Sequence, residues 1–219
     1  HWSRPSARDS NMNTAIVRAD SPDAIQRALV VLNKGGLIAF PTDTVYGVGA
    51  PVFDGKAVES IYVAKDRPIE KAIPVLIADA DDMDKVGMDI PDVARGIAAR
   101  FFPGPLTCLI PKQPTLPSAV SATSTVGVRV PDHEVARALL RAAGPMAVTS
   151  ANISGQPSPS TAEEVFAQLS GRIELIIDGG KTPGGVPSTV VDCTNNEIKI
   201  LREGPISLEE IKLKLSSPI

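Results

Sequence analysis

Hydrophobic residues along this chain follow two spacings, one typical of helices and one typical of buried strands. After Ser21, a good N-cap, and Pro22, a good first helical residue, apolar side chains recur at helical spacing until Gly35 and Gly36 end the pattern. Similar patterns predict helices at 55–67, 91–102, 133–144, 161–171 and 207–215. Short apolar runs predict strands at 36–40, 73–78, 106–110, 126–130, 146–149, 174–178 and 188–192.

Helices and strands are mixed irregularly, and strands follow one another near 106–130 and 186–202. This order predicts a single α/β domain with a twisted, mixed, largely open sheet flanked by helices. We expect the domain to span residues 14–219. Residues 1–13 contain no apolar stretch, so they are not a signal peptide and are expected to be a disordered leader or expression-derived residues.

Composition narrows the class of protein. Of the 219 residues, 43% are hydrophobic but only 4% are aromatic, so a core of Val, Ile, Leu and Ala is expected. The net charge of −3 argues against nucleic-acid binding over the whole surface, although a local basic groove is compatible with it. No run approaches the roughly 20 apolar residues of a membrane helix. We therefore expect no membrane contact and a cytoplasmic location.

The cysteines and histidines exclude several kinds of site. Cys108 and Cys193 each lie in an apolar run, which predicts two buried free thiols and a reducing compartment. His1 and His133 are the only histidines, so neither a zinc site nor a serine–histidine triad is expected. His133 is expected in the first turn of the helix that follows it. The chain also lacks the GxxxxGK[ST] and GxGxxG nucleotide-binding patterns.

Two polar segments follow the early strand and helix. PTDTVYGVG (41–49) carries Thr42, Thr44 and Tyr46, whose alternation on an extended segment suits a small polar ligand, whereas a tight turn would explain only the glycines. AKDRPIEK (64–71) places three cations around a predicted helix end. They are either a phosphate clamp or cations that interact with the helix dipole.

Four further segments offer polar groups at strand ends. Arg129 interrupts an apolar strand, where it either faces solvent or pairs with a carboxylate in a cleft. AVTSANISGQPSPS (147–160) presents small hydroxyls and backbone N–H groups suited to a nucleotide, or forms a helix-capping loop. GGVPSTVVD (184–192) and ILREG (200–204) contribute Ser188 and Arg202. Each of these last two segments alone would be interpreted as structural.

Together and in this order, the six segments resemble the YrdC-like (TsaC) family, the threonylcarbamoyl-AMP synthases. The shared motifs are PTDTVYGVGA, the K-x-R-P of KDRP, PGPLT, GVRVPDH, SANISG and STVVD, which extend over about residues 22–207. The resemblance implies the YrdC-like fold in its short, single-domain form, whereas longer members add a linker and a second domain that covers the site.

The resemblance also implies a reaction. L-threonine, bicarbonate and ATP would give threonylcarbamoyl-adenylate and pyrophosphate, for the t6A37 modification of tRNA. Such an enzyme is a nucleotidyltransferase. ATP is then a substrate, Mg²⁺ is expected to assist through the phosphates, and no metal site formed by the protein is expected. A threonylcarbamoyl-transferase complex is the expected partner, with tRNA as a further candidate.

Residue roles carried over from the family divide the polar segments between the two substrates. Lys65 and Arg67 are expected to be catalytic, because a carbamate is already nucleophilic and needs charge neutralisation rather than a base. ATP contacts are expected from Arg67, Lys71, Thr125, Ser150, Asn152, Ser158 and Arg202. Threonine contacts are expected from Thr44, Arg129, Val148 by its backbone, and Ser188, with Arg129 on the carboxylate. Lys71 and Leu76 depart from the family pattern, since many members carry Asn and His there.

Two other functions remain open at this stage. The cationic face could belong to a double-stranded RNA or tRNA-binding module without catalysis, whose binding would fall steeply with salt. A carbamoyl-transfer module of a hydrogenase-maturation protein shares the domain, but it predicts zinc-finger and acylphosphatase-like segments that this sequence lacks.

Overall fold

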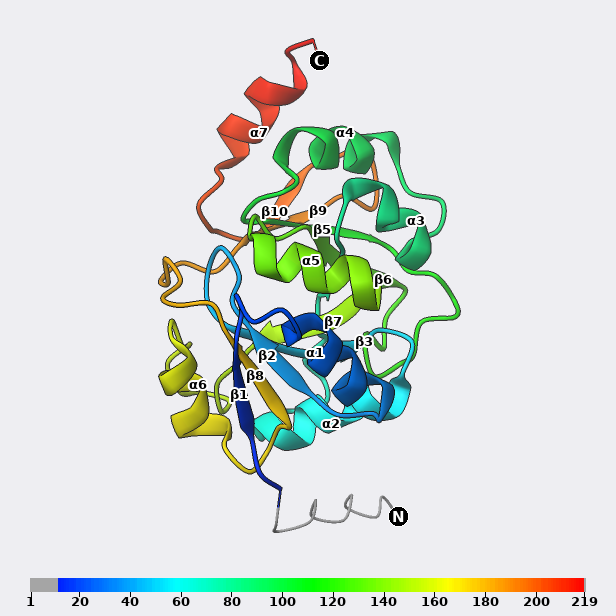
Figure 1. The fold of residues 1–219 in the computed structure, drawn as a ribbon. Helices are drawn as coiled ribbons and strands as arrows, with labels where there is room; N and C mark the ends of the chain where they lie inside the picture. The colour runs from blue at the N-terminus through cyan, green and yellow to red at the C-terminus, as the bar shows by residue number, and fades with distance from the viewer. Residues whose placement is uncertain (1–11, 219) are drawn as a thin grey trace.

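The computed structural model describes residues 12–218, in which helices surround a mixed sheet (Figure 1). The strands are β1 (Ala15–Arg18), β2 (Ile38–Phe40), β3 (Gly47–Pro51), β4 (Val75–Leu76), β5 (Leu106–Pro111), β6 (Thr125–Arg129), β7 (Met146–Ser150), β8 (Leu175–Asp178), β9 (Thr189–Asp192) and β10 (Lys199–Arg202). The helices are α1 (Ala24–Asn33), α2 (Gly55–Lys65), α3 (Met83–Val86), α4 (Asp92–Phe101), α5 (Glu134–Ala143), α6 (Ala162–Leu169) and α7 (Leu208–Leu215), with a 3-10 turn at Ala80–Asp82.

The sheet is open and mixed. Its order within the described chain is β1-β8-β2-β3-β7-β4-β6-β5-β9-β10, so β1 and β10 are its edges. The pairs β1–β8, β2–β8, β4–β6 and β5–β9 are parallel, whereas β2–β3, β3–β7, β4–β7, β5–β6 and β9–β10 are antiparallel. The predicted α/β class with a mixed open sheet is confirmed.

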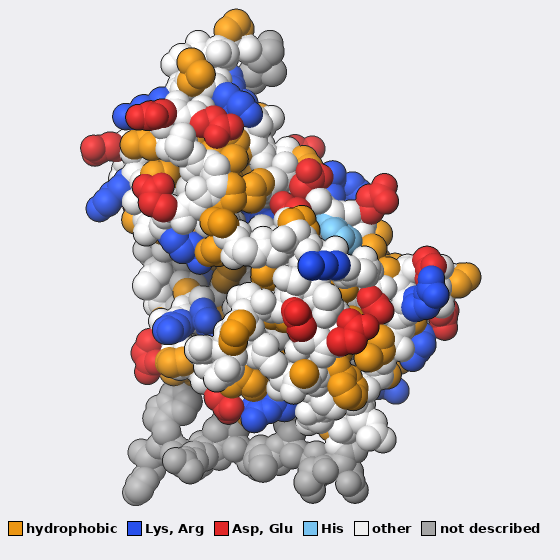
Figure 2. Space-filling view, turned by 90° about the vertical axis from the view of Figure 1, so that its left-hand side faces the viewer, with side chains coloured by type: hydrophobic (Ala, Val, Ile, Leu, Met, Phe, Trp, Pro, Cys, Tyr) orange, Lys and Arg blue, Asp and Glu red, His pale blue; other side chains and the backbone are white. Residues whose placement is uncertain are grey.

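Helices cover both faces of the sheet, and two apolar clusters form the core. One cluster joins α1 and α5 to β1, β2, β7 and β8, and these two helices lie side by side in Figure 1. The larger cluster packs α2, α4 and α6 against the other side. The core is built almost wholly from aliphatic side chains, as the composition predicts. On the face shown in Figure 2, acidic and basic side chains are interspersed.

Two strands that the apolar pattern did not predict complete the sheet. β1 lies at the edge beside β8, and β3 occupies the glycine-containing GVGAP segment. Glycine is a weak strand former, but β3 is paired along both edges, with β2 and β7. A Cβ on Gly47 would lie 2.6 Å from Val148 Cγ1, so glycine there lets β3 and β7 approach closely. Tertiary pairing thus outweighs local propensity.

Several predicted boundaries were wrong by a few residues. α1 begins at Ala24 rather than at Ser21 and Pro22, because Ser21 Oγ donates to Asp23 Oδ1 (2.6 Å) in a preceding turn instead of capping the helix. Of the strand predicted at 73–78, only Val75–Leu76 forms a strand. His133 is the N-cap of α5, one residue before its first turn.

The two thiols are as predicted, and Cys108 and Cys193 are free and buried. The leader predicted at residues 1–13 lies outside the described residues except for residues 12 and 13, and the domain boundary stays a prediction. Among the described residues, none of the helices has the length and apolar character needed to cross a membrane. The cytoplasmic location stays a prediction.

Candidate functional site

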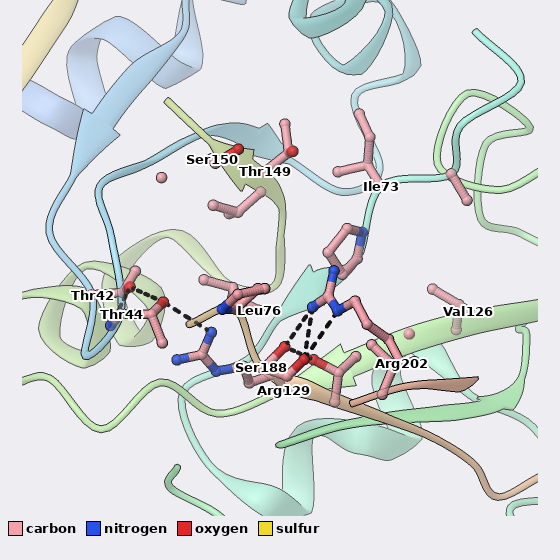
Figure 3. Close-up of a pocket in the computed structure, with 18 of the residues that line it drawn as sticks. Thr42, Thr44, Ile73, Leu76, Val126, Arg129, Thr149, Ser150, Ser188 and Arg202 are labelled. Carbon is pink, nitrogen blue, oxygen red and sulfur yellow. Dashed lines mark hydrogen bonds between the residues drawn. The ribbon is translucent and has the colours of Figure 1, made fainter. Parts of the chain in front are cut away.

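A cavity of about 530 Å³ lies against the middle of the sheet (Figure 3). Strands β3, β4, β5, β6, β7, β9 and β10 contribute residues to its wall, together with the loop after β2 and the loop after α2. Its lining combines aliphatic side chains such as Leu76 and Val148 with hydroxyls and arginines. This mixture suits a ligand that is small, polar and anionic.

Most of the predicted site residues meet at this cavity. Those that line it are Thr44, Arg67, Thr125, Arg129, Val148, Ser150, Ser158, Ser188 and Arg202. Lys65, Lys71 and Asn152 are not among the lining residues of the described chain. Segments separated by more than a hundred residues in the sequence therefore converge, and the expected contacts of each residue with a substrate stay predictions.

The loop after β2 presents two of its three predicted hydroxyls to the cavity. Thr42 Oγ1 donates to Val45 O (2.7 Å) and lies 3.1 Å from Thr44 Oγ1, which fixes the tight loop. Tyr46 points away from the cavity, and its hydroxyl donates to Gly180 O (2.7 Å). Burial is the main cause that raises the pKa of Tyr46 to about 12. The expectation that all three hydroxyls face one ligand was therefore wrong for Tyr46.

Arg129 is a buried cation in the cavity wall, with 7% of the residue exposed. Its Nε donates to Gly104 O (3.0 Å), its Nη1 donates to Thr44 Oγ1 (3.4 Å), and its Nη2 forms an ion pair with Asp43. Burial lowers the pKa of Arg129, and the Asp43 carboxylate opposes that shift. The sequence-based alternative in which Arg129 faces a cleft and pairs with a carboxylate is the one that the structure adopts.

A second arginine, Arg202, lines the same cavity. Arg202 donates from Nε and Nη2 to Ser188 O (3.1 and 2.8 Å), and Nη2 also donates to Ser188 Oγ (3.1 Å). Ser188 Oγ lies 2.8 Å from Thr107 Oγ1. Figure 3 shows Ser188 between the two arginines. Two guanidinium groups with adjoining hydroxyls form a positively charged wall that fits carboxylate or phosphate groups.

Lys65 holds the loop after β7 instead of lining the cavity. The residue is 1% exposed, and its Nζ donates to Asn152 O (2.6 Å) and to Ser150 O. Its own carbonyl accepts from Ser154 N (2.7 Å). Burial, with a smaller contribution from Arg67, lowers the pKa of Lys65 to about 7. This position favours an indirect role for Lys65, through the Ser150 side chain that lines the cavity.

The other two cations of the AKDRPIEK segment separate. Arg67 lines the cavity, and its guanidinium donates to Lys71 O (3.3 Å) and Ala72 O (2.9 Å), which folds the segment back on itself. Burial lowers the pKa of Arg67. Lys71 is exposed. α2 ends at Lys65, with Asp66 in the left-handed conformation as its C-cap.

Sequence reasoning predicted Thr125 but missed the neighbouring hydroxyls of Ser121 and Thr123. The three residues form a row along the cavity, in which Thr123 Oγ1 lies 3.1 Å from Ser121 Oγ and 3.2 Å from Thr125 Oγ1. Their alternate spacing was the available signal, since alternate residues of an extended chain share one side. Thr107 gave no comparable signal, because it lies within an apolar strand.

The expected assistance by Mg²⁺ stays a prediction. The described residues contain no group of three or more His, Cys, Asp or Glu side chains that could hold a metal ion. The acidic residue beside the cavity, Asp43, is engaged with Arg129.

Comparison with known proteins found relatives over most of the chain. The model of the Sua5, YciO and YrdC family, described as telomere recombination, matches residues 30–204. A Pyrococcus abyssi protein named threonylcarbamoyl-AMP synthase is 44% identical over 190 residues, which are 86% of this chain and 56% of that protein. A Bacillus subtilis protein of the same name is 42% identical over 191 residues, covering 86% and 55%.

A solved structure carries the same fold. The P. abyssi Sua5 protein complexed with L-threonine matches with a TM-score of 0.85 at 40% identity, over 94% of this chain and 61% of that one. The chain spans little more than half the length of the two curated relatives above. The family match nevertheless covers most of the sequence and all the segments that build the cavity wall. This chain belongs to the Sua5/YciO/YrdC family.

Proposed function

We propose that this chain is an L-threonylcarbamoyladenylate synthase, a nucleotidyltransferase. The observation that carries the proposal is the cavity in which Arg129, Arg202 and Arg67 line one space together with hydroxyl groups. Three guanidinium groups around one small cavity fit a ligand set with several negative charges, such as an amino-acid carboxylate beside a triphosphate. The names of the relatives and the L-threonine bound to P. abyssi Sua5 support threonine as the amino acid.

The chemistry needs orientation more than proton transfer. The threonine amine and bicarbonate give a carbamate with loss of water. A carbamate oxygen then attacks the α-phosphorus of ATP, and the bond to pyrophosphate breaks. Because the carbamate is already anionic, the protein has to bring two anions together and neutralise charge on the leaving pyrophosphate.

The cavity residues divide naturally between the two substrates. Arg129 and Thr44, on one side, would bind the threonine carboxylate, with Ser188 beside it. Arg67, Arg202 and the Thr125 row of hydroxyls would face ATP. Lys65 would act by holding Ser150 in place. Aliphatic walls from Leu76 and Val148 would exclude water from the reacting groups.

Several finer points are part of the same proposal. ATP is taken as a substrate, and Mg²⁺ is taken to arrive on its phosphates rather than on a protein site. The product would pass to a threonylcarbamoyl-transferase complex acting on tRNA. Direct tRNA binding without catalysis is the competing function, and the net charge of −3 does not favour it.

Pyrophosphate release tests the proposal. The purified chain is incubated with ATP, and L-threonine or bicarbonate is left out in turn. We expect release that requires both, and an adduct whose mass equals that of threonylcarbamoyl-adenylate. Release without threonine would indicate a different nucleotide reaction. Folded protein that releases none and binds tRNA with steep salt dependence would support the RNA-binding alternative.

A further inference from the structure

Asp43 is the feature that the roles above leave unused. It lies in the loop after β2, next to Thr44, and its side chain is only 13% exposed. It does not line the cavity, yet it forms an ion pair with Arg129, which does. Burying two charges is costly, and replacing such a pair by apolar groups is often neutral or stabilising. Stability alone is therefore a weak reason for a buried pair at this position.

The hydrogen bonds of Arg129 show what the pair can do. A guanidinium has five N–H bonds, and here one on each nitrogen is used, for Gly104 O, Thr44 Oγ1 and Asp43. Within the described part of the chain, the second N–H of each terminal nitrogen has no acceptor. Two N–H bonds on adjacent nitrogens are what a bidentate carboxylate contact requires.

We propose that Asp43 is a positioning residue, which holds the Arg129 guanidinium so that its two remaining N–H bonds receive the carboxylate of the amino-acid substrate. This inference rests on the proposed function, since it concerns the same site. Asp43 and Thr44 are consecutive residues, and each contacts one terminal nitrogen of Arg129. The loop after β2 is thereby fastened to β6 by two neighbouring side chains.

The surroundings of Asp43 fit this role. His133, the N-cap of α5, also lies close enough to interact electrostatically with Asp43. Burial lowers the pKa of His133, with the Asp43 carboxylate opposing that shift. Arg129 is the cation with which Asp43 forms an ion pair. Without Asp43, Arg129 would keep its contacts to Gly104 O and Thr44 Oγ1 but lose the ionic contact that fixes Nη2.

The test compares Asp43→Ala and Asp43→Asn with the wild type. The amide of Asn keeps a hydrogen-bond acceptor but no charge, so it separates orientation from ion pairing. We expect Asp43→Ala to raise KM for L-threonine about tenfold or more, because a misplacement of about 1 Å can cost about 100-fold. The Asn variant should lie between Ala and wild type. KM for ATP should change less than about twofold in both variants.

A substrate without the carboxylate makes the test specific. L-threoninamide replaces the carboxylate by an amide, so Asp43→Ala should hardly affect its KM. The effects of changing the residue and of changing the substrate should therefore be coupled rather than additive. Equal losses for threonine and threoninamide would overturn the inference, since they would indicate a general structural role. So would an unchanged KM for threonine in both Asp43 variants.

Controls separate the possible failures. Asp84→Ala removes an exposed carboxylate that pairs with Arg95 outside the cavity, and it should leave both KM values unchanged. Should Asp43→Ala not fold, as judged by circular dichroism, Asp43→Asn carries the same comparison. Wild-type protein that releases no pyrophosphate would reject the proposed function. If the wild type is active and the KM for L-threonine is unchanged in Asp43→Asn, only the role of Asp43 is rejected.

Discussion

Single residues in this protein differ sharply in how directly they reach the cavity. Arg67 and Lys71 both follow α2 and both carry a positive charge, but Arg67 lines the cavity and Lys71 is exposed. Lys65, at the end of α2, is 1% exposed and bonded to two carbonyls. Three cations that are alike in the sequence therefore have three different physical roles.

The contrast between Arg67 and Lys71 can be tested directly. Arg67→Met should weaken ATP binding about tenfold or more, because it removes a charge from the cavity wall, where charge-assisted bonds are worth about 1.5–3 kcal/mol. Lys71→Met should change ATP affinity less than about twofold, since exposed charges contribute little. Isothermal titration calorimetry with ATP measures both. Equal losses in the two variants would contradict the position of Lys71 outside the cavity.

Lys65 should make stability depend on pH. Burial lowers its folded-state pKa to about 7, below the ordinary value of 10.5. Between these values the unfolded chain binds a proton that the folded chain does not, so the unfolding free energy should rise with pH, by about 1.4 kcal/mol per unit, and stay level below pH 7. Urea unfolding from pH 6 to 10 should show this rise in the wild type relative to Lys65→Met. Parallel curves would contradict it.

At the scale of elements, close packing of β9 and β10 places Ser188 and Arg202 together. Gly204 follows β10 and lies against the backbone at Ser188. A Cβ there would lie 2.7 Å from the Ser188 carbonyl carbon and closer still to Thr189 N. Backbone atoms cannot turn aside as a side chain can. The position of one glycine thus keeps two site residues in register.

Gly204→Ala should therefore destabilise the protein by about 1–3 kcal/mol, the usual cost of overpacking, and lower synthase activity. Gly96→Ala is the matched control, because its new Cβ would make only an ordinary contact, 3.4 Å from Leu215 Cδ2, inside α4. That variant should gain about 0.5–1 kcal/mol from helix propensity. Denaturant unfolding measures both changes. A Gly204→Ala variant as stable as the wild type would contradict the close approach.

At the scale of the whole molecule, the cavity draws residues from most of the sheet. Its wall runs from Thr42 to Arg202 and includes residues of strands β3 to β7, β9 and β10. A ligand in this space would contact many elements at once. Binding should therefore oppose global unfolding rather than stabilise one segment.

L-threonine should raise Tm for this reason. At about 100 times its Kd, a ligand of the folded state adds about 2.7 kcal/mol, which for a chain of this size corresponds to about 5–10 °C. Differential scanning calorimetry with L-threonine, and with D-threonine as control, measures the shift. An absence of any shift at tens of millimolar, or an equal shift with both enantiomers, would contradict a specific threonine site.

The sequence alone determined the fold class and most of the elements, because helical and strand spacings of aliphatic residues are local properties. It also pointed to nine residues that line the cavity, since the ordered motifs identify the family and the family's contacts follow residue by residue. The local sequence pattern did not predict a strand where pairing with neighbouring strands determines the structure. β3 forms from a glycine-rich segment only because β2 and β7 flank it.

Only the tertiary structure decided the direction of the polar side chains. Tyr46 turns to Gly180, Lys65 turns to the carbonyls of Ser150 and Asn152, and Asp43 turns to Arg129. In each case the partner is at least 80 residues away in the sequence. Buried polar groups must find hydrogen-bond partners, and which partner is within reach depends on how the whole chain packs.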